Sequence, residues 1–162
     1  MRMIVAIETV LLCAGLFLMC FWGTGTDDKN LKSYSSYPDE VRGRIRGIAE
    51  YQGRFREAKV APAFLANFFL FLSLFLVLGL FFKEKSFVHN FVCLSVLGQG
   101  LNVFDLVVID LVWWRNARRI RLSRIPEKEP YQNPKKHVEA FGRALAMYLL
   151  VALIDGYLLT LL

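Results

Sequence analysis

Four long apolar runs separate the polar parts of this chain, and they restrict its fold more than any other feature. A bilayer core about 30 Å thick needs about 20 apolar residues in a helix that rises about 1.5 Å per residue. The runs that reach this length are residues 3–22, 61–82, 91–114 and 142–162. The sequence therefore predicts an all-α, polytopic membrane protein, with four transmembrane helices in an antiparallel bundle and one transmembrane domain over residues 1–162.

Composition agrees with this interpretation. The 162 residues are 56% hydrophobic, above the roughly 45–50% of soluble domains, and a soluble fold of this length could not bury so much apolar surface. Cys13, Cys20 and Cys93 lie inside apolar runs without a CxxC spacing, so neither a disulfide framework nor a zinc site is indicated. Glu8 interrupts the first run and no A-x-A site follows, which favours a retained span over a cleaved signal peptide.

The basic residues flank the apolar runs, which indicates anionic lipid headgroups, and not nucleic acid, as their partner. Residues 23–60 and 115–136 hold eight Lys and Arg each, against three on the opposite side. The positive-inside rule then predicts cytoplasmic loops at 23–60 and 115–138, with both termini outside the cytoplasmic membrane. Five arginines directly follow Trp113 and Trp114 and are candidate headgroup ligands: Arg115, Arg118, Arg119, Arg121 and Arg124.

The first long loop is expected to contain an amphipathic helix. Pro38 suits a first helical turn, and Val41, Ile45, Ile48 and Phe55 fall on one helical side. This helix is predicted to lie on the inner leaflet. Ordering against the 115–138 loop, or a solvated charged helix, are the alternatives. In the second long loop, Asn133 followed by Pro134 predicts that the fourth helix begins before the membrane.

A polar stripe follows the third span. At about 100° per residue, the five polar positions fall within an arc of about 140°: Ser95, Gln99, Asn102, Asp105 and Asp110. Lipid cannot hydrogen-bond these groups, so the stripe must face helices or water. One interpretation is a packing seam of interhelical hydrogen bonds, favoured for Gln99 and Asn102, and the other is a binding site. Asp105 and Asp110, about 7.5 Å apart along an α-helix, argue against one shared ion.

Depth sorts the remaining polar groups. Asp110, Arg143 and Asn67 fall near the face of the two long loops, where an Asp110–Arg143 ion pair would keep both charges. The alternative is that Arg143 reaches the headgroups and pairs with Glu139. Glu8 and Asp155 are each seven residues from an end of the chain and are predicted to reach similar depths near the opposite face. Neighbouring carboxyls there would share a proton or a cation.

The leading hypothesis is a bundle interior that binds or conducts a polar or cationic solute, with protons as one candidate. It would be lined by Asp105, Asp110, Asn102, Gln99, Asn67 and Arg143, with Glu8 and Asp155 as further acidic sites. One alternative is an enzyme for a lipid phosphate or isoprenoid, and only this alternative would need Mg²⁺. Another is a non-catalytic subunit of a larger membrane complex. A homo-oligomer is expected because four helices are few for a transporter. His89 and His137 fall on opposite sides, which argues against a histidine-based metal centre or dyad.

Two segments carry a resemblance. The run FDLVVIDLVWWRNARRIR at residues 104–121 and the run YQNPKK at residues 131–136 are similar to segments of small, uncharacterised bacterial integral membrane proteins. The resemblance implies a four-helix membrane protein and no particular activity.

Overall fold

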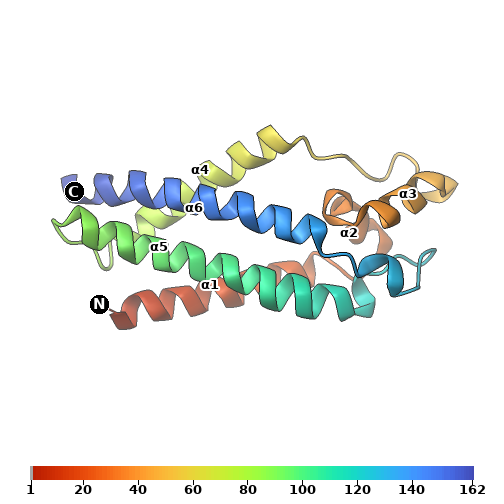
Figure 1. Ribbon diagram of the computed structural model, residues 1–162, viewed down its shortest axis with the longest axis horizontal. Coiled ribbons are helices and arrows are strands. Elements are labelled where there is room, and N and C mark those ends of the chain that lie inside the picture. Colours follow the sequence, from red (N-terminus) through yellow and green to blue (C-terminus); the bar gives the residue numbers. More distant parts are fainter. Residues whose placement is uncertain (1) are drawn as a thin grey trace. The chain divides into compact units, whose positions relative to one another are not determined.

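The computed structural model describes residues 2–162, and within this range the regular structure is helical apart from an isolated bridge between Leu122 and Ile125. Four helices are long (Figure 1): α1 (Arg2–Trp22), α4 (Val60–Gly79), α5 (Phe87–Phe104) and α6 (Lys135–Leu161). Helix α5 continues directly into a π-helix, η3 (Asp105–Trp114). The short elements are α2 (Asp27–Lys32), η1 (Tyr34–Ser36), α3 (Asp39–Gly47), η2 (Ala49–Tyr51), η4 (Arg118–Ile120) and η5 (Glu129–Tyr131).

The four predicted spans are present as helices long and apolar enough to cross a membrane, which confirms a multi-pass membrane protein by length and composition. They are Met3–Trp22, Val60–Gly79, Phe87–Trp114 and Glu129–Leu161. The second ends at Gly79 and not at residue 82, because the next residues form a turn in which Phe82 N donates to Gly79 O. The third begins earlier than predicted, at Phe87, next to Ser86, whose hydroxyl accepts the N–H of His89 at 3.3 Å.

The start of the fourth helix agrees with the sequence. Helix α6 begins at Lys135, and the Lys135 N–H donates to Asn133 Oδ1 at 3.0 Å. Val138 N donates to Pro134 O at 3.0 Å, so the first helical turn follows the Asn-Pro pair. Because the most apolar part of the helix comes later, its first turns carry Lys136 and His137 ahead of that part.

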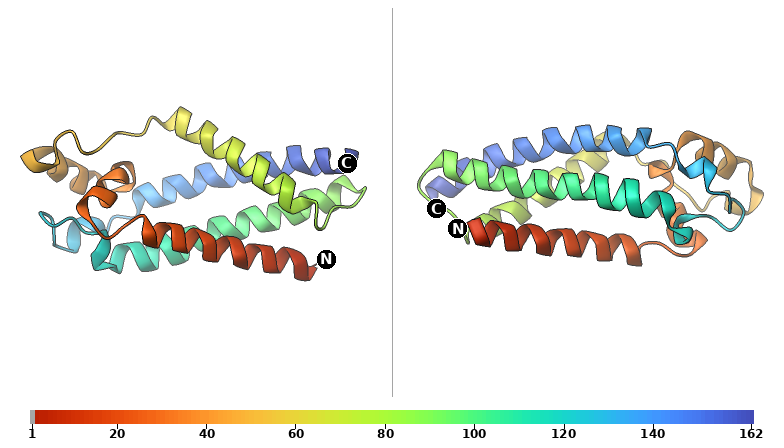
Figure 2. Two further views of the ribbon diagram at one scale, coloured as in Figure 1. Left: turned by 180° about the vertical axis from the view of Figure 1, so that it is seen from behind. Right: turned by 60° about the horizontal axis from the view of Figure 1, so that its bottom comes forward.

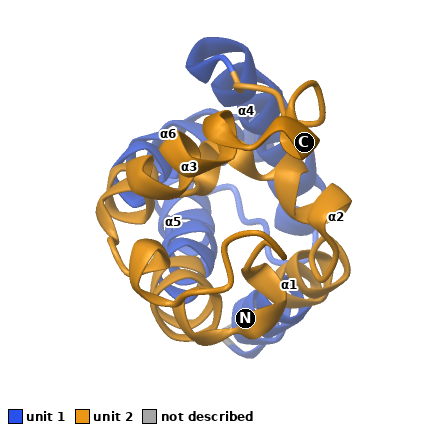
Figure 3. Ribbon diagram, turned by 90° about the vertical axis from the view of Figure 1, so that its right-hand side faces the viewer, with its two compact units in different colours: residues 1–14, 59–104, 141–162 blue, residues 15–58, 105–140 orange. Residues whose placement is uncertain are grey.

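The chain divides into two compact units, coloured separately in Figure 3. Unit 1 contains the chain up to residue 14 together with residues 59–104 and 141–162. Unit 2 contains residues 15–58 and 105–140. The long helices α1 and α6 contribute to both units, and the third span changes from α-helix to π-helix where it passes from unit 1 to unit 2.

Glycines set the packing of unit 1 around α5. A Cβ at Gly98 of α5 would lie 3.0 Å from Phe75 Cε2 on α4 and 3.0 Å from Tyr148 Cβ on α6. A Cβ at Gly156 of α6 would lie 3.1 Å from the backbone nitrogen of Phe91. Small residues allow such approach between membrane helices, where lipid removes the hydrophobic drive for helix association. Since Gly98 meets Tyr148 while Phe91 meets Gly156, α5 and α6 are antiparallel.

Glycines also mark the contacts of α4 and α1 in unit 1. Leu159 of α6 packs onto Gly79 of α4, and Tyr148 of α6 contacts the Phe75 ring, so α4 and α6 run in the same direction. Gly100 of α5 faces the Thr9 side chain of α1. The views in Figures 1 and 2 agree that consecutive long helices alternate in direction within this unit.

We expect Gly156→Leu to lower the free energy of unfolding by about 1–3 kcal/mol, because the larger side chain forces the α5 and α6 backbones apart. Gly142→Leu on the same helix is the matched control, since a Cβ at Gly142 meets nothing within 4 Å. It should be neutral or slightly stabilising because leucine is the better helix former. Thermal unfolding of the full chain in detergent measures both variants, and equal midpoints would contradict the close helix contact.

Unit 2 has a hydrophobic core of its own, built largely from the two long loops. Its buried members are Leu31, Tyr34, Tyr37, Val41, Ile45, Tyr51, Trp114, Ile120, Leu122, Ile125 and Tyr131. The hydroxyls of its tyrosines are hydrogen-bonded inside this core, as buried polar groups require. Tyr37 Oη donates to Ile120 O at 2.7 Å, and Tyr131 Oη accepts the Leu122 N–H at 3.1 Å and donates to Ile125 O at 3.0 Å. The Tyr37 bond joins the first loop to the second, and the two Tyr131 bonds hold the second loop together.

The amphipathic helix of the first loop is shorter than predicted and faces protein. Helix α3 ends at Gly47, with Pro38 as its N-cap residue, and Phe55 lies beyond it. Val41 and Ile45 are fully buried in the core of unit 2. The prediction that this apolar side rests on the lipid leaflet is therefore wrong, and the alternative of ordering against the second loop is the one that the structure adopts.

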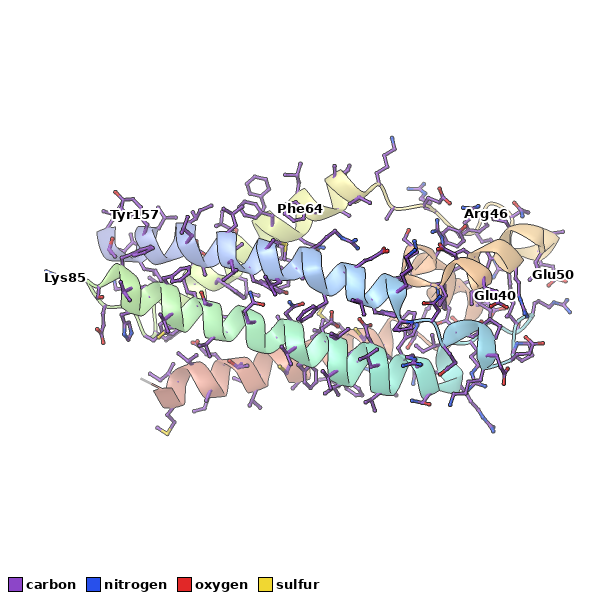
Figure 4. All side chains as sticks on the ribbon, in the orientation of Figure 1. Glu40, Arg46, Glu50, Phe64, Lys85 and Tyr157 are labelled. Carbon is purple, nitrogen blue, oxygen red and sulfur yellow. The ribbon has the colours of Figure 1, made fainter. Side chains whose placement is uncertain are left out.

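The outer surface of unit 2 is charged. Figure 4 shows Glu40, Arg46 and Glu50 on its short elements. Glu40 pairs with Arg44 at 2.8 Å, Arg46 pairs with Glu57, and Glu50 accepts from Arg124 Nε at 2.7 Å. Exposed pairs of this kind contribute little stability each. They indicate a surface that faces water.

Asp27 is a polar junction of unit 2. Its carboxylate accepts the N–H of Ser123 at 2.9 Å, the Tyr51 hydroxyl at 2.7 Å, and the Ser123 hydroxyl. Burial raises the pKa of Asp27, but the bonds from the Ser123 hydroxyl, the Tyr51 hydroxyl and the Ser123 N–H outweigh it. The pKa therefore lies below the ordinary value of 3.8.

The lowered pKa of Asp27 predicts acid-sensitive stability. Its contribution is fully present above the unfolded-state pKa and is lost as the pH falls through the lower native pKa. We expect Asp27→Asn to be less stable than the parent by about 1–3 kcal/mol near pH 6, and the difference to shrink toward about pH 3. Urea unfolding of the full chain at the two pH values measures this. Glu129→Gln, which removes an exposed acid, is the control, and a pH-independent deficit in Asp27→Asn would disprove the prediction.

Candidate functional site

Two amides of the predicted polar stripe are engaged in helix packing within unit 1. Gln99 Nε2 donates to Leu145 O at 3.1 Å, and Asn102 Nδ2 donates to Phe141 O at 3.3 Å. Both acceptors are backbone carbonyls of α6. These bonds match the packing-seam interpretation, in which amides join neighbouring helices where lipid offers no partner. Ser95, on the same helix, has a buried hydroxyl oxygen without a partner in the described part of the chain.

The two predicted acids of the far face are both buried in unit 1. Asp155 is completely buried, and neither of its carboxyl oxygens has a hydrogen-bond partner among residues 2–162. Glu8 is 8% exposed and its Oε2 is likewise buried without a described partner. An unsatisfied carboxyl of this kind is costly inside a membrane protein, which makes both acids candidates for a functional position.

The sequence predicted similar depths for Glu8 and Asp155, and the structure places them at different depths. Thr9, next to Glu8, contacts α5 at Gly100, whereas Gly156, next to Asp155, contacts α5 at Phe91. Nine residues of α5 separate those two levels, which is roughly 13 Å along the helix. The prediction failed because equal distance from the two chain ends does not set the register between two helices.

Asn67 and Arg143 do not line an interior. Both side chains are exposed on unit 1, and neither has a hydrogen bond or ion pair in the described part of the chain. The predicted ion pair between Arg143 and Asp110 is absent, because the partner of Asp110 is His137. The alternative pair with Glu139 is absent as well among the described residues. Both residues had been assigned to the interior from depth alone, and depth does not determine on which side of its helix a residue lies.

The central site of unit 2 is a cluster of Asp105, Asp110 and His137, here called the Asp–His cluster. His137 Nδ1 lies 2.9 Å from Asp110 Oδ1, with side chains only 6% and 15% exposed. Asp105 interacts electrostatically with both of the others. The cluster joins η3 to the first turns of α6, and so joins the third span to the helix that follows the second long loop.

The π-helix brings the two aspartates to one side. In an α-helix, residues 105 and 110 would be roughly 140° apart. In η3 the backbone bonds run from i to i+5, so residues five apart follow one another on the same side. Short π-helical turns often mark functional positions, and here ten residues from Asp105 to Trp114 adopt this conformation. The α-helical spacing used for the sequence therefore overstated the separation of the two acids.

Aromatic side chains cover the cluster. The Trp114 ring meets the His137 ring edge-on with centroids 5.8 Å apart, and Tyr37 packs against Trp114 at 5.6 Å. His137 Nε2 and Trp114 Nε1 are buried without a hydrogen-bond partner in the part of the chain that the structure describes. Because Asp110 holds Nδ1, Nε2 is the nitrogen left to bind or release a proton. The thiol of Cys20 on α1 also interacts electrostatically with both aspartates.

His137 is a candidate site residue that the sequence interpretation missed. The two histidines were judged as a possible pair with each other, and their places on opposite faces excluded that pair. A signal was nevertheless present, because Asp110 lies four residues before Trp114 and His137 lies four residues after the predicted cap Asn133. Both positions belong to the same face of the membrane, and an acid and a histidine at one face are a candidate pair.

The arginines after Trp114 have separate roles. Arg119 donates to Phe21 O at 2.8 Å and to Thr24 O at 3.0 Å, and its guanidinium lies 3.6 Å from the centre of the Phe21 ring. Arg124 binds Glu50, and Arg115 has a buried Nε without a described partner. Arg118 and Arg121 line an open depression with Leu122, Ser123 and Pro126. Of the five arginines, Arg118 is thus the most available to headgroups.

Among residues 2–162, no three His, Cys, Asp or Glu side chains are grouped so that they could hold a metal ion. The chain matches no protein-family model, no curated protein and no solved structure.

Proposed function

We propose that this chain is a multi-pass protein of the cytoplasmic membrane that binds and transfers protons, with the Asp–His cluster as its main proton-binding site. The observation that carries the proposal is the buried contact of 2.9 Å between His137 Nδ1 and Asp110 Oδ1, with Asp105 interacting electrostatically with both. Histidine changes charge near neutral pH, and carboxylates beside it stabilise the protonated ring.

Three features of the cluster suit a proton better than a larger solute. The two atoms of the pair are close enough to pass a proton without any change of position. The free Nε2 of His137 offers an exit or entry atom on the other side of the ring. Trp114 packs against His137 and Tyr37 packs against Trp114, and limited access for water strengthens the electrostatic interaction of the three charges.

The acids of unit 1 supply further proton-binding positions. Glu8 and Asp155 are buried, have unpaired oxygens in the described structure, and occupy different levels along α5. The α5 contacts of their neighbours Thr9 and Gly156 lie nine residues apart, roughly 13 Å along the helix, which is several times the length of a hydrogen bond. Transfer between them would run through water molecules bridging the gap. Gln99 and Asn102 hold α5 and α6 together in this scheme and carry no proton.

The orientation belongs to the same proposal. The excess of Lys and Arg in residues 23–60 and 115–136 supports a cytoplasmic location of unit 2 and an extracytoplasmic location of both termini. Unit 2 carries a surface of ion pairs, which suits an aqueous compartment. A homo-oligomer would supply the wider helix assembly that four helices lack.

We expect purified protein in liposomes to move protons under an imposed membrane potential, and Asp105→Asn with Asp110→Asn to abolish that flux. A pH-sensitive dye inside the liposomes measures the flux. His137→Gln should reduce the flux at least tenfold, in line with the loss of a positioned proton-transfer group. Glu139→Gln is the matched control, since Glu139 lies two residues from His137, is exposed, and has no described ion pair.

Unchanged flux in the double variant, with normal folding by circular dichroism, would reject proton transfer through the cluster. Loss of flux in Glu139→Gln as well would mean that any change of charge near the start of α6 disturbs the protein, and would equally remove support for the cluster.

A second candidate function is an enzyme that acts on a lipid phosphate or isoprenoid. The favouring observation is that Asp110 orients His137 Nδ1 and leaves Nε2 unpaired, which is the arrangement of a general base. Arg118 and Arg121 line the open depression of unit 2 and offer charge for a phosphate. In this case the buried pair would activate water or a hydroxyl group.

If the protein is this enzyme, we expect it to turn over a lipid diphosphate. The turnover should depend on Mg²⁺ and be absent in Asp110→Asn. Phosphate release from detergent-solubilised lipid diphosphate measures it, with Glu139→Gln again as control. Turnover that persists in Asp110→Asn would exclude the pair as the catalytic base. Co-purification with a larger membrane complex, and neither flux nor turnover in isolation, would point to an accessory subunit.

A further inference from the structure

A second group of reactive side chains lies in unit 1, where the turn after α4 meets the start of α5. His89 Nε2 lies 3.6 Å from Cys93 Sγ, one helical turn further along α5. His89 Nδ1 lies 3.7 Å from Glu84 Oε2 on the turn. The ring thus has a thiol at one nitrogen and a carboxylate at the other, which is the arrangement that activates a cysteine nucleophile. None of the three residues belongs to the Asp–His cluster.

The backbone of the turn holds Glu84 beside His89. Asn90 is completely buried, and its side chain makes two bonds to the backbone of Glu84. Asn90 Oδ1 accepts the Glu84 N–H at 2.9 Å, and Asn90 Nδ2 donates to Glu84 O at 2.8 Å. These two bonds fix the place of Glu84, so its half-exposed carboxylate starts from a set position next to the ring.

The surroundings of His89 suit a base that takes the thiol proton. In the neutral ring with its proton on Nδ1, Nε2 is the acceptor that faces Cys93 Sγ. After proton transfer, Nε2–H has the Phe82 carbonyl oxygen at 3.2 Å as a further acceptor, and the Glu84 carboxylate lies beside Nδ1–H. A thiol in apolar surroundings is a poor nucleophile until a base removes its proton. His89 is placed to supply that base.

The depth of Cys93 points to a lipid ester as the reaction partner. The third span, Phe87–Trp114, has 28 residues, more than the about 20 that cross the hydrocarbon, so it begins within the headgroup region. That region is about 5–8 Å thick in each leaflet, and Cys93 lies six residues, about 9 Å, past Phe87. Val92 and Val96 beside it are 50% and 56% exposed, so this side of α5 faces lipid. Cys93 therefore lies near the ester carbonyls of the surrounding phospholipids.

We propose that Cys93 accepts an acyl chain from a membrane phospholipid, with His89 as the base and Glu84 as the residue that positions His89. The thiol proton passes to His89 Nε2, and the sulfur attacks the carbonyl carbon of the ester. The C–S bond forms and the C–O bond to glycerol breaks. The proton held by His89 then passes to the departing glycerol oxygen. The products are a thioester on Cys93 and a lysophospholipid.

Two exposed lysines favour an anionic donor. Lys83 and Lys85 flank Glu84 on the turn, and Lys85 is labelled in Figure 4. Their ammonium groups attract anionic headgroups at the membrane surface. We therefore expect phosphatidylglycerol to donate its acyl chain faster than phosphatidylcholine.

Incubation of the full chain in phosphatidylglycerol vesicles, followed by mass spectrometry of the intact protein and of its peptides, tests this site. We expect one acyl adduct on Cys93, which neutral hydroxylamine removes because it cleaves thioesters. Cys93→Ala should carry no adduct. His89→Ala should form the adduct at least tenfold more slowly, and added imidazole should restore part of the rate. Cys20→Ala is the matched control and should react like the parent, since Cys20 is a partly exposed cysteine of another span.

Glu84 is tested separately because it acts through His89. Glu84→Gln should slow acylation less than His89→Ala does, and Glu84→Asp, which keeps the carboxylate, should recover most of the rate. Glu84 is an exposed side chain on a turn, so these variants keep the test valid if His89→Ala does not fold. Circular dichroism verifies the folding of each variant.

A parent protein without an adduct would overturn the proposal, as would equal rates in the parent and His89→Ala. An adduct on Cys13 or Cys20, or one that resists hydroxylamine, would equally overturn it. Equal rates with phosphatidylcholine would contradict the preference for an anionic donor. The site lies outside the Asp–His cluster, so its failure leaves proton transfer untouched.

Discussion

The absence of hydrogen-bonding partners in hydrocarbon is the constraint on which this structure depends. Each polar side chain in a spanning helix must find a partner in protein, in water or at the lipid headgroups. Gln99 and Asn102 find backbone carbonyls of α6. Asp110 finds His137. The carboxyl of Asp155 has no described partner.

Unit 2 shows how loops can create an ionisable site at the end of a span. Its aromatic core fixes the second long loop, and the bond from Tyr37 Oη to Ile120 O ties that loop to the first. Helix α6 therefore begins ahead of its apolar run, and its first turns carry His137 to Asp110. The π-helix completes the arrangement, since it turns Asp105 to the side of Asp110. Loop packing and helix geometry act together at this site.

Much of the helical framework could be predicted from the sequence, because span length and hydropathy depend on each segment alone. The first span agrees at both ends, and the Asn133 cap marks the start of α6 as expected. For Gln99 and Asn102 a packing seam was favoured over a binding site, and both amides do bond across to a neighbouring helix. These features are local, or follow from the rule that buried amides need partners.

The wrong site predictions share one cause. The depth of a residue along its helix was used where the register between two helices and the rotation of each helix were needed. Glu8 and Asp155 are equally far from the chain ends, yet their neighbours Thr9 and Gly156 contact α5 at levels nine residues apart. Asn67 and Arg143 were placed in the interior from depth alone, but they lie on exposed sides of their helices. Depth follows from counting residues along one segment. Register and rotation depend on which surfaces of two helices fit together.

The sequence by itself determined that four apolar segments form helices long enough to cross a membrane, and that these helices carry acids. It did so because a helix satisfies its own backbone and its apolar length is a property of one segment. Only the tertiary structure decided which acids have partners, through the close approach of Gly98 and Gly156 to neighbouring helices, the π-helical turn between Asp105 and Asp110, and the loop core that places His137. These contacts join residues far apart in the chain, and their energies depend on side-chain shapes that fit only after both segments have folded.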